Sequence, residues 1–164
     1  MVWRRIGWLQ VPNSRPNWWT SHSAIPTVIS SDGGNVNLVV STRDREQRSS
    51  AAHLKIRVTP DTVELLAIGD EPVLEPGSAG MFDESGVNVT CCTSLNGEVS
   101  AWYHGWFLRQ GGGWLNSIGM ASGKPESRLT RISRAPVFDR STEDPTSIAY
   151  PFWYQFPWGR ALFY

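Results

Sequence analysis

The sequence predicts an all-β protein made of four-stranded antiparallel units, on three observations. Short segments alternate apolar and polar residues, Gly, Pro and Asn gather between these segments, and the whole pattern recurs along the chain. No segment combines apolar residues at helical spacing with capping residues, so little helix is expected. With 164 residues, the chain is expected to form a single domain over 1–164.

The repeat consists of three hairpin-like segments. They begin at Ile25 (IPTVISSDGGNVNLVVS), Gly86 (GVNVTCCTSLNGEVSAWYHGW) and Ser147 (SIAYPFWYQFPWGRALFY), so successive starts are 61 residues apart. Each segment has a short alternating strand, a two-residue turn and a second strand, which is the pattern of a β-hairpin. The turns are Asp32-Gly33, Asn96-Gly97 and Trp158-Gly159.

Further strands are expected between the hairpins. AAHLKIRVT and DTVELLAIG follow the first hairpin, and WLNSIGMAS and SRLTRIS follow the second. The linking segment Pro72-Val73-Leu74 reappears 64 residues later as Pro136-Val137-Phe138. Four antiparallel strands at a fixed period are the sequence pattern of a β-propeller blade. A sandwich of two sheets built from the same hairpins is the alternative fold.

The predicted propeller is partial. Blade one is expected at about 22–70, blade two at about 83–134 and half a blade at about 144–164. A five-bladed propeller with this period needs about 310 residues, so the chain supplies two and a half blades. The sequence leaves three interpretations open: a fragment of a longer protein, a chain whose exposed sheet edges close in a homodimer, or a remnant.

Composition excludes several classes of partner. The 15 basic and 15 acidic side chains balance, which argues against nucleic acid. No apolar run has the length of a secretory signal or a membrane span, so no membrane partner is expected. Cys91 and Cys92 are adjacent and point to opposite faces of a strand, so free thiols in a reducing cytoplasm are expected.

Nine tryptophans are the most unusual feature of the composition. Exposed indoles form stacking platforms for ligands such as sugars, whereas buried ones fill a β core. Trp106 is taken as a substrate contact. It is one of five tryptophans to which both interpretations apply: Trp18, Trp19, Trp102, Trp106 and Trp114. His104, between aromatic residues of one strand, is expected to pack.

The period predicts a site at the starts of the inner strands. His22, Asp83 and Asp144 are 61 residues apart in each step and precede the inner strand of their units. Because inner strands line the channel of a propeller, these side chains are expected to converge there. Two facing carboxylates are the requirement of glycosidic bond hydrolysis. Glu84, beside Asp83, is either a substrate contact or a solvated cap of the turn.

The order of several short motifs resembles the five-bladed β-propeller glycosidases, which include the family 43 arabinanases and xylosidases and the invertase and levansucrase group. The motifs are SHSAIPTVI, STRD, GMFDESGV, NSIGMAS and EDPTSIAYPF, and they cover nearly the whole chain. By this resemblance, Asp144 matches the orienting aspartate of the third blade, and His22 stands where the family has its catalytic base. Asp83 takes a substrate-facing position, and Arg43-Asp44 resembles a clamp for sugar hydroxyls.

The resemblance implies a carbohydrate-active, glycoside hydrolase-like protein. Asp144 and Asp83 are the predicted catalytic residues, and the predicted substrate contacts are His22, Arg43, Asp44, Glu84 and Trp106. The family's general acid belongs to a fourth blade that has no counterpart here, so an enzyme and a non-catalytic carbohydrate-binding or assembly module are both retained, together with a truncated remnant. No cofactor is expected, although one calcium ion in the channel stays open.

Overall fold

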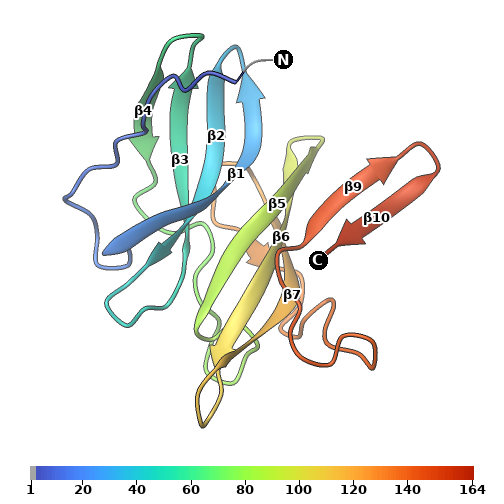
Figure 1. Ribbon diagram of the computed structural model, residues 1–164. Helices are drawn as coiled ribbons and strands as arrows, with labels where there is room; N and C mark the ends of the chain where they lie inside the picture. The colour runs from blue at the N-terminus through green and yellow to red at the C-terminus, as the bar shows by residue number, and fades with distance from the viewer. Residues whose placement is uncertain (1–2) are drawn as a thin grey trace.

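The computed structural model describes residues 3–164 and shows an all-β chain, as the sequence predicts. Two four-stranded antiparallel sheets are followed by a two-stranded hairpin near the C-terminus (Figure 1). No helix is present among these residues, and hence none that could cross a bilayer. The two sheets and the hairpin follow the order of the three predicted units.

The first sheet has its strands in chain order, β1-β2-β3-β4. They are β1 (Ser21–Asp32), β2 (Asn35–Arg43), β3 (Ala51–Val58) and β4 (Val63–Ile68). Gly33 and Gly34, with φ of 54° and 87°, form the tight turn between β1 and β2. The pairing of β1 with β2 shifts register three times, so β1 is bulged along much of its length.

The second sheet repeats this order as β5-β6-β7-β8. Its strands are β5 (Gly86–Leu95), β6 (Glu98–Leu108), β7 (Trp114–Gly123) and β8 (Thr130–Arg131). Asn96 and Gly97 both have positive φ, 53° and 80°, as a two-residue hairpin turn requires. The C-terminal hairpin pairs β9 (Phe152–Phe156) with β10 (Gly159–Phe163).

The sequence period corresponds to a repeat in space. The first strand of each unit lies beside that of the next, in the order β1, β5, β9 (Figure 1). Thr27 Oγ1 donates to the carbonyl of Val89 at 3.1 Å, and Thr90 Oγ1 donates to that of Pro151 at 2.6 Å. These bonds span 62 and 61 residues, so similar hydrogen bonds join successive units one period apart.

The repeated linker also takes equivalent positions in the two sheets. The segment Val73-Leu74 exchanges backbone hydrogen bonds of 2.8 and 2.9 Å with Ala51 at the start of β3. Val137-Phe138 exchanges bonds of 2.8 and 2.9 Å with Ile118 in β7. Each linker therefore adds a bridge to the third strand of its own sheet, which explains why the tripeptide recurs.

Two apolar clusters form the core. One joins the two sheets through residues including Val39, Leu74, Val89 and Tyr103. The other packs the first sheet against the N-terminal segment through the buried Trp19. Five tryptophans were expected either to fill the core or to form a stacking platform. Of these five, only Trp19 is fully buried, and Trp114 is largely exposed.

The two cysteines are free, as expected from their adjacency. Cys91 is buried, and burial raises the pKa of the Cys92 thiol to about 12. The thiolate is the reactive form of cysteine, so the raised pKa makes the Cys92 thiol a poor nucleophile.

Candidate functional site

A cavity of about 500 Å³ lies where the units meet. It is called the convergence cavity below, and its principal lining residues are His22, Arg43, Asn88, Trp106, Asn116 and Tyr150. The first sheet contributes the start of β1 and the end of β2, the second sheet contributes three strands, and the segment before β9 supplies Tyr150. Three successive units therefore build one site.

The second sheet lines this cavity with alternate residues of β6. His104, Trp106 and Leu108 all face it, because every second residue of a strand points to the same side. Asn88 of β5 pairs in register with His104, and Asn116 of β7 pairs with Trp106. Two amides, an imidazole and an indole are thus held on one rigid sheet face.

Trp106 is fixed at its ring nitrogen. Its Nε1 donates a hydrogen bond to Ser49 Oγ at 2.8 Å. This bond occupies the space beside Gly86 that a side chain would fill. A Cβ at Gly86 would lie 2.6 Å from Nε1 and 2.1 Å from Ser49 Oγ, so only glycine leaves room for this bond. The guanidinium carbon of Arg43 lies 4.8 Å from the centre of the Trp106 ring, in a cation–π contact.

Arg43 ends β2 and is half-buried. Its Nη1 donates to the carbonyl of Gln47 at 3.0 Å, and burial lowers its pKa below the usual value. The adjacent Asp44 is turned to other partners. It accepts the backbone N–H groups of Glu46 and Arg48 and forms an ion pair with Arg48 Nε at 3.0 Å. The predicted Arg43-Asp44 clamp therefore contributes only Arg43 to the cavity.

His104 is buried behind the cavity surface and neutral. Its Nδ1 accepts the backbone N–H of Tyr150 at 3.3 Å, so the ring proton lies on Nε2. The Asn88 atom placed 2.9 Å from Nε2 is the amide nitrogen Nδ2. Because a ring proton on Nε2 requires an acceptor, the amide is assigned the turned orientation, in which its oxygen faces Nε2. Burial, followed by the positive charge of Arg43, lowers the pKa of His104 to about 4. His104 thus orients Asn88 and Tyr150. The centre of the Tyr150 ring lies 4.7 Å from the centre of the imidazole ring.

His22 lies at the cavity with a left-handed backbone, φ 63°. Tyr150, in the same lining, is also left-handed, with φ 57°. Such backbone is uncommon for residues with a Cβ and tends to occur at functional sites. The carbonyl of His22 accepts the indole N–H of Trp19 at 2.5 Å, so a core tryptophan holds this residue in place.

Asp83 lies in the interior and does not line the convergence cavity. Its side chain is 0% exposed and forms an ion pair with Arg131 Nε at 2.7 Å. Tyr103 Oη donates to the same carboxylate oxygen at 3.1 Å. Burial and then the charge of Asp83 raise the pKa of Tyr103 above its usual value. These partners tie the segment before β5 to β6 and β8, which is a structural function.

Asp144 is partly exposed in the segment before β9. It accepts a hydrogen bond from Tyr164 Oη at 2.8 Å, and its N–H donates to Ser141 Oγ at 3.2 Å. It lines neither cavity. Of the three strand-start residues, only His22 therefore lines the convergence cavity, and the catalytic roles of Asp83 and Asp144 stay predictions.

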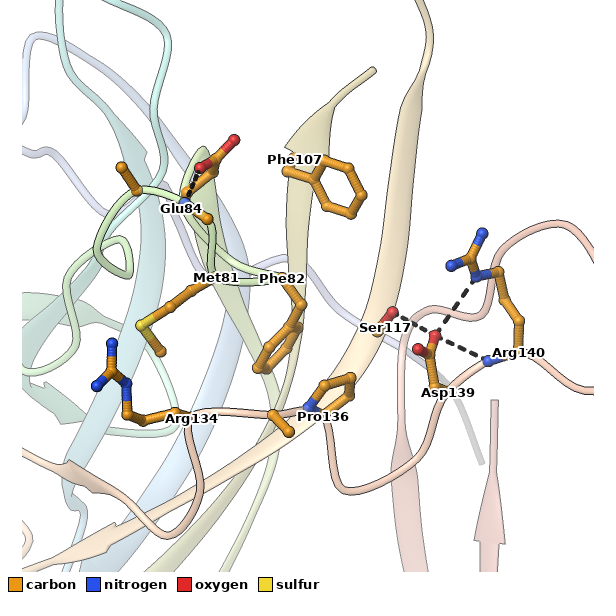
Figure 2. A pocket seen from close by; sticks show the side chains of 12 residues that line it. Met81, Phe82, Glu84, Phe107, Ser117, Arg134, Pro136, Asp139 and Arg140 are labelled. Carbon is orange, nitrogen blue, oxygen red and sulfur yellow. Dashed lines mark hydrogen bonds and ion pairs between the residues drawn. The ribbon is translucent and has the colours of Figure 1, made fainter. Parts of the chain in front are cut away.

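A second cavity, of about 630 Å³, lies on the other side of the second sheet. Phe107 and Ser117 line it, whereas their chain neighbours Trp106 and Asn116 line the convergence cavity. Figure 2 shows Glu84 at its edge, where the carboxylate accepts the N–H of Gly80 at 2.5 Å. Across the cavity, Asp139 accepts a 2.7 Å hydrogen bond from Ser117 Oγ. Glu84 is thus a cap of its own turn and is separated from the other predicted contacts.

No metal centre is evident from the side chains. Among residues 3–164, no group of three His, Cys, Asp or Glu side chains is arranged to hold an ion. Calcium in the channel stays an untested possibility of the sequence.

Of the twelve residues that line the convergence cavity, only His22, Arg43 and Trp106 were predicted as site residues. Those that were missed include Asn88, His104, Asn116 and Tyr150. The alternation of His104, Trp106 and Leu108 was a usable signal, since Trp106 was already a predicted contact. For Tyr150, no local signal exists, because its place depends on the third unit folding against the second.

Comparison with known proteins finds relatives that are uncharacterized and a solved structure of similar fold. No known protein-family profile matches the chain. The uncharacterized proteins MT1551 and Rv1502 of Mycobacterium tuberculosis are each 32% identical to it over 151 residues, which is 92% of this chain and 50% of theirs. The chain thus spans about half the length of the curated relatives it matches.

One solved structure resembles the chain in fold. Zg3597, a family 117 glycoside hydrolase of the marine bacterium Zobellia galactanivorans, superposes with a TM-score of 0.63 at 15% identity. The match covers 91% of this chain and 41% of the hydrolase. The predicted likeness to a glycosidase fold is therefore confirmed at the level of fold. The neighbour belongs to family 117, so a relationship to family 43 or the invertase group stays a prediction.

Proposed function

We propose that this chain forms the carbohydrate-binding part of a glycoside hydrolase-like protein, with the convergence cavity as the sugar site. The observation that carries the proposal is the lining of that cavity: aromatic rings and planar polar side chains brought together from three units. The glycosidase-type fold is consistent with this function but does not establish it.

The chemistry of the lining suits a sugar. Sugar rings present apolar C–H faces that pack on aromatic rings, and hydroxyls that pair with amides and guanidinium groups. Trp114 and Tyr150 are 67% and 63% exposed, so their rings are accessible at the cavity. Asn88 and Asn116 supply amides from the sheet face.

Hydrolysis makes a further demand that this lining does not meet. Cleavage of a glycosidic bond requires two carboxylates about 5 to 10 Å apart across the substrate. In the described part of the chain, the cavity has one carboxylate, Glu46, which is 74% exposed and lies 3.3 Å from Arg48 Nε. Hydrolytic activity therefore needs a second carboxylate from outside this lining. The presence of a single carboxylate also favours a second candidate function, that of a non-catalytic carbohydrate-binding module.

The test is oligosaccharide binding by wild-type protein and a Trp106→Ala variant, measured by calorimetry and tryptophan fluorescence. Removing this ring from the cavity lining, and with it the support of the Arg43 guanidinium, should weaken binding at least about tenfold. Trp158→Ala is the matched control, because this exposed tryptophan lies on the C-terminal hairpin and does not line the cavity. Equal affinity of Trp106→Ala and wild type, or no binding by wild type, would reject the proposal.

The same preparations should be assayed on aryl-glycosides and on any oligosaccharide that binds. Turnover abolished by Asp144→Asn, with binding unchanged, would establish the enzyme. Binding without turnover would establish the non-catalytic module.

A further inference from the structure

The convergence cavity contains a half-buried cation without a counter-ion. In residues 3–164, Arg43 forms no ion pair with a carboxylate, whereas the partly buried Arg131 is paired with Asp83. Burying an unpaired charge is unfavourable, so an unpaired guanidinium at a cavity indicates that a ligand completes it.

The acidic residues nearest in the chain do not form an ion pair with Arg43. Asp44 is committed to Arg48 and to two backbone N–H groups. Glu46 is also within 3.3 Å of Arg48 Nε and extends into solvent. Both carboxylates of this loop therefore have Arg48 as their ion-pair partner. Asp44 favours the charged form of Arg43 from a distance and Glu46 lines the same cavity, but neither forms an ion pair with the Arg43 guanidinium.

The geometry of Arg43 leaves donors free for a ligand. Only Nη1 has a hydrogen-bond partner among the described residues, the carbonyl of Gln47, and the guanidinium is held in place against the Trp106 ring. A guanidinium has five N–H donors in a fork that matches carboxylate and sulfate oxygens. The charge acts within the cavity, because it contributes, after burial, to the lowered pKa of His104.

We propose that the sugar bound in the convergence cavity is anionic, with a carboxylate or sulfate group paired with Arg43. This inference rests on the proposed carbohydrate-binding function. A neutral sugar could offer hydroxyls to the guanidinium but would leave its charge uncompensated, whereas a uronic acid or a sulfate ester would compensate it. Stacking of the sugar ring on the aromatic residues of the lining would hold the anionic group at Arg43, so that no second cation is needed to position it.

The experiment uses pairs of oligosaccharides that share a skeleton and differ in charge. The pairs are oligogalacturonides and their methyl esters, glucuronoxylan oligosaccharides and plain xylo-oligosaccharides, and sulfated and desulfated galacto-oligosaccharides. Affinity is measured by calorimetry at low and high salt. At least one charged member should bind about tenfold or more tightly than its neutral partner, with the difference falling as salt rises. The pair that responds distinguishes a carboxylate from a sulfate.

Variants assign the effect to Arg43. Arg43→Gln should abolish the preference for the charged member, and Arg43→Lys should keep part of it. Arg134→Gln is the matched control, since it makes the same change of net charge at the second cavity. Trp106→Ala should weaken both members of a pair and reduce the preference between them, because the Trp106 ring also holds the Arg43 guanidinium in place.

The outcomes separate this inference from the proposed function. Neutral and charged members bound equally well, with Arg43→Gln weakening both alike, would overturn the anionic ligand and leave carbohydrate binding intact. A charge preference that survives Arg43→Gln would also overturn it. Failure of every oligosaccharide to bind would reject both.

Discussion

Replacing Asp83 with asparagine tests whether this carboxylate is structural, as its partners indicate, or catalytic, as its place in the repeat predicts. The substitution keeps the shape of the side chain and removes its charge. Arg131, whose side chain is 20% exposed, then loses the counter-ion 2.7 Å from its Nε. The hydrogen bond donated by Tyr103 Oη can be accepted by a side-chain oxygen of aspartate or of asparagine.

The expected loss of stability follows from these contacts. Removing one partner of a fully buried ion pair costs about 3–5 kcal/mol. Arg131 keeps some contact with solvent and its hydrogen bond to the carbonyl of Glu75, which lowers the expected loss to about 2–4 kcal/mol. For a chain of this size, that corresponds to a fall in Tm of about 5–12 °C.

The assay is urea and thermal unfolding followed by circular dichroism and tryptophan fluorescence. Asp144→Asn is the control and should change the free energy of unfolding by less than about 0.5 kcal/mol, because Asp144 is partly exposed and pairs only with neutral groups. If Asp83→Asn unfolds like wild type, the structural role is refuted. A double-mutant cycle with Arg131→Gln should give a coupling energy above about 1 kcal/mol.

Two further predictions concern the second sheet. A Cβ at Gly119 would lie 2.2 Å from the buried Tyr103 ring, so Gly119→Ala should lower the free energy of unfolding by about 1–3 kcal/mol in urea titrations, and an unchanged midpoint would contradict this contact. The pKa of His104 falls from 6.5 to about 4 on folding, so the unfolded chain binds more protons between these values. Stability should therefore be full above about pH 6.5 and decline as the pH falls towards 4, and His104→Gln should remove part of this slope.

Much of the architecture follows from local sequence. Strand alternation and paired turn residues such as Asn96-Gly97 identify the hairpins, because the left-handed backbone of these turns is accessible to few residue types. The 61-residue period identifies which strands are equivalent, and the recurring linker shows that the first two units end in the same way. Trp106 could be chosen from its residue type, and Arg43 from the resemblance of its motif to the glycosidase propellers, and both lie in the convergence cavity.

The sequence period does not predict the direction in which each side chain points. A period maps positions onto one another, but one extra residue in a strand turns every following side chain to the opposite face. β1 contains such irregularities near His22 and β5 contains one near Cys91, so equivalent positions do not imply equivalent faces.

The fate of Asp83 shows this most clearly. Its partner Arg131 is 48 residues away, and only the packing of β8 against the segment before β5 brings the two charges together in the interior. The convergence cavity depends in the same way on three units meeting, since His22, Asn88 and Tyr150 have no local relation in the chain. The sequence alone determined the strands, their turns and their repetition, because these depend on neighbouring residues. Which carboxylates are buried and which side chains share a cavity was decided by tertiary packing, because both depend on contacts between residues far apart in the chain.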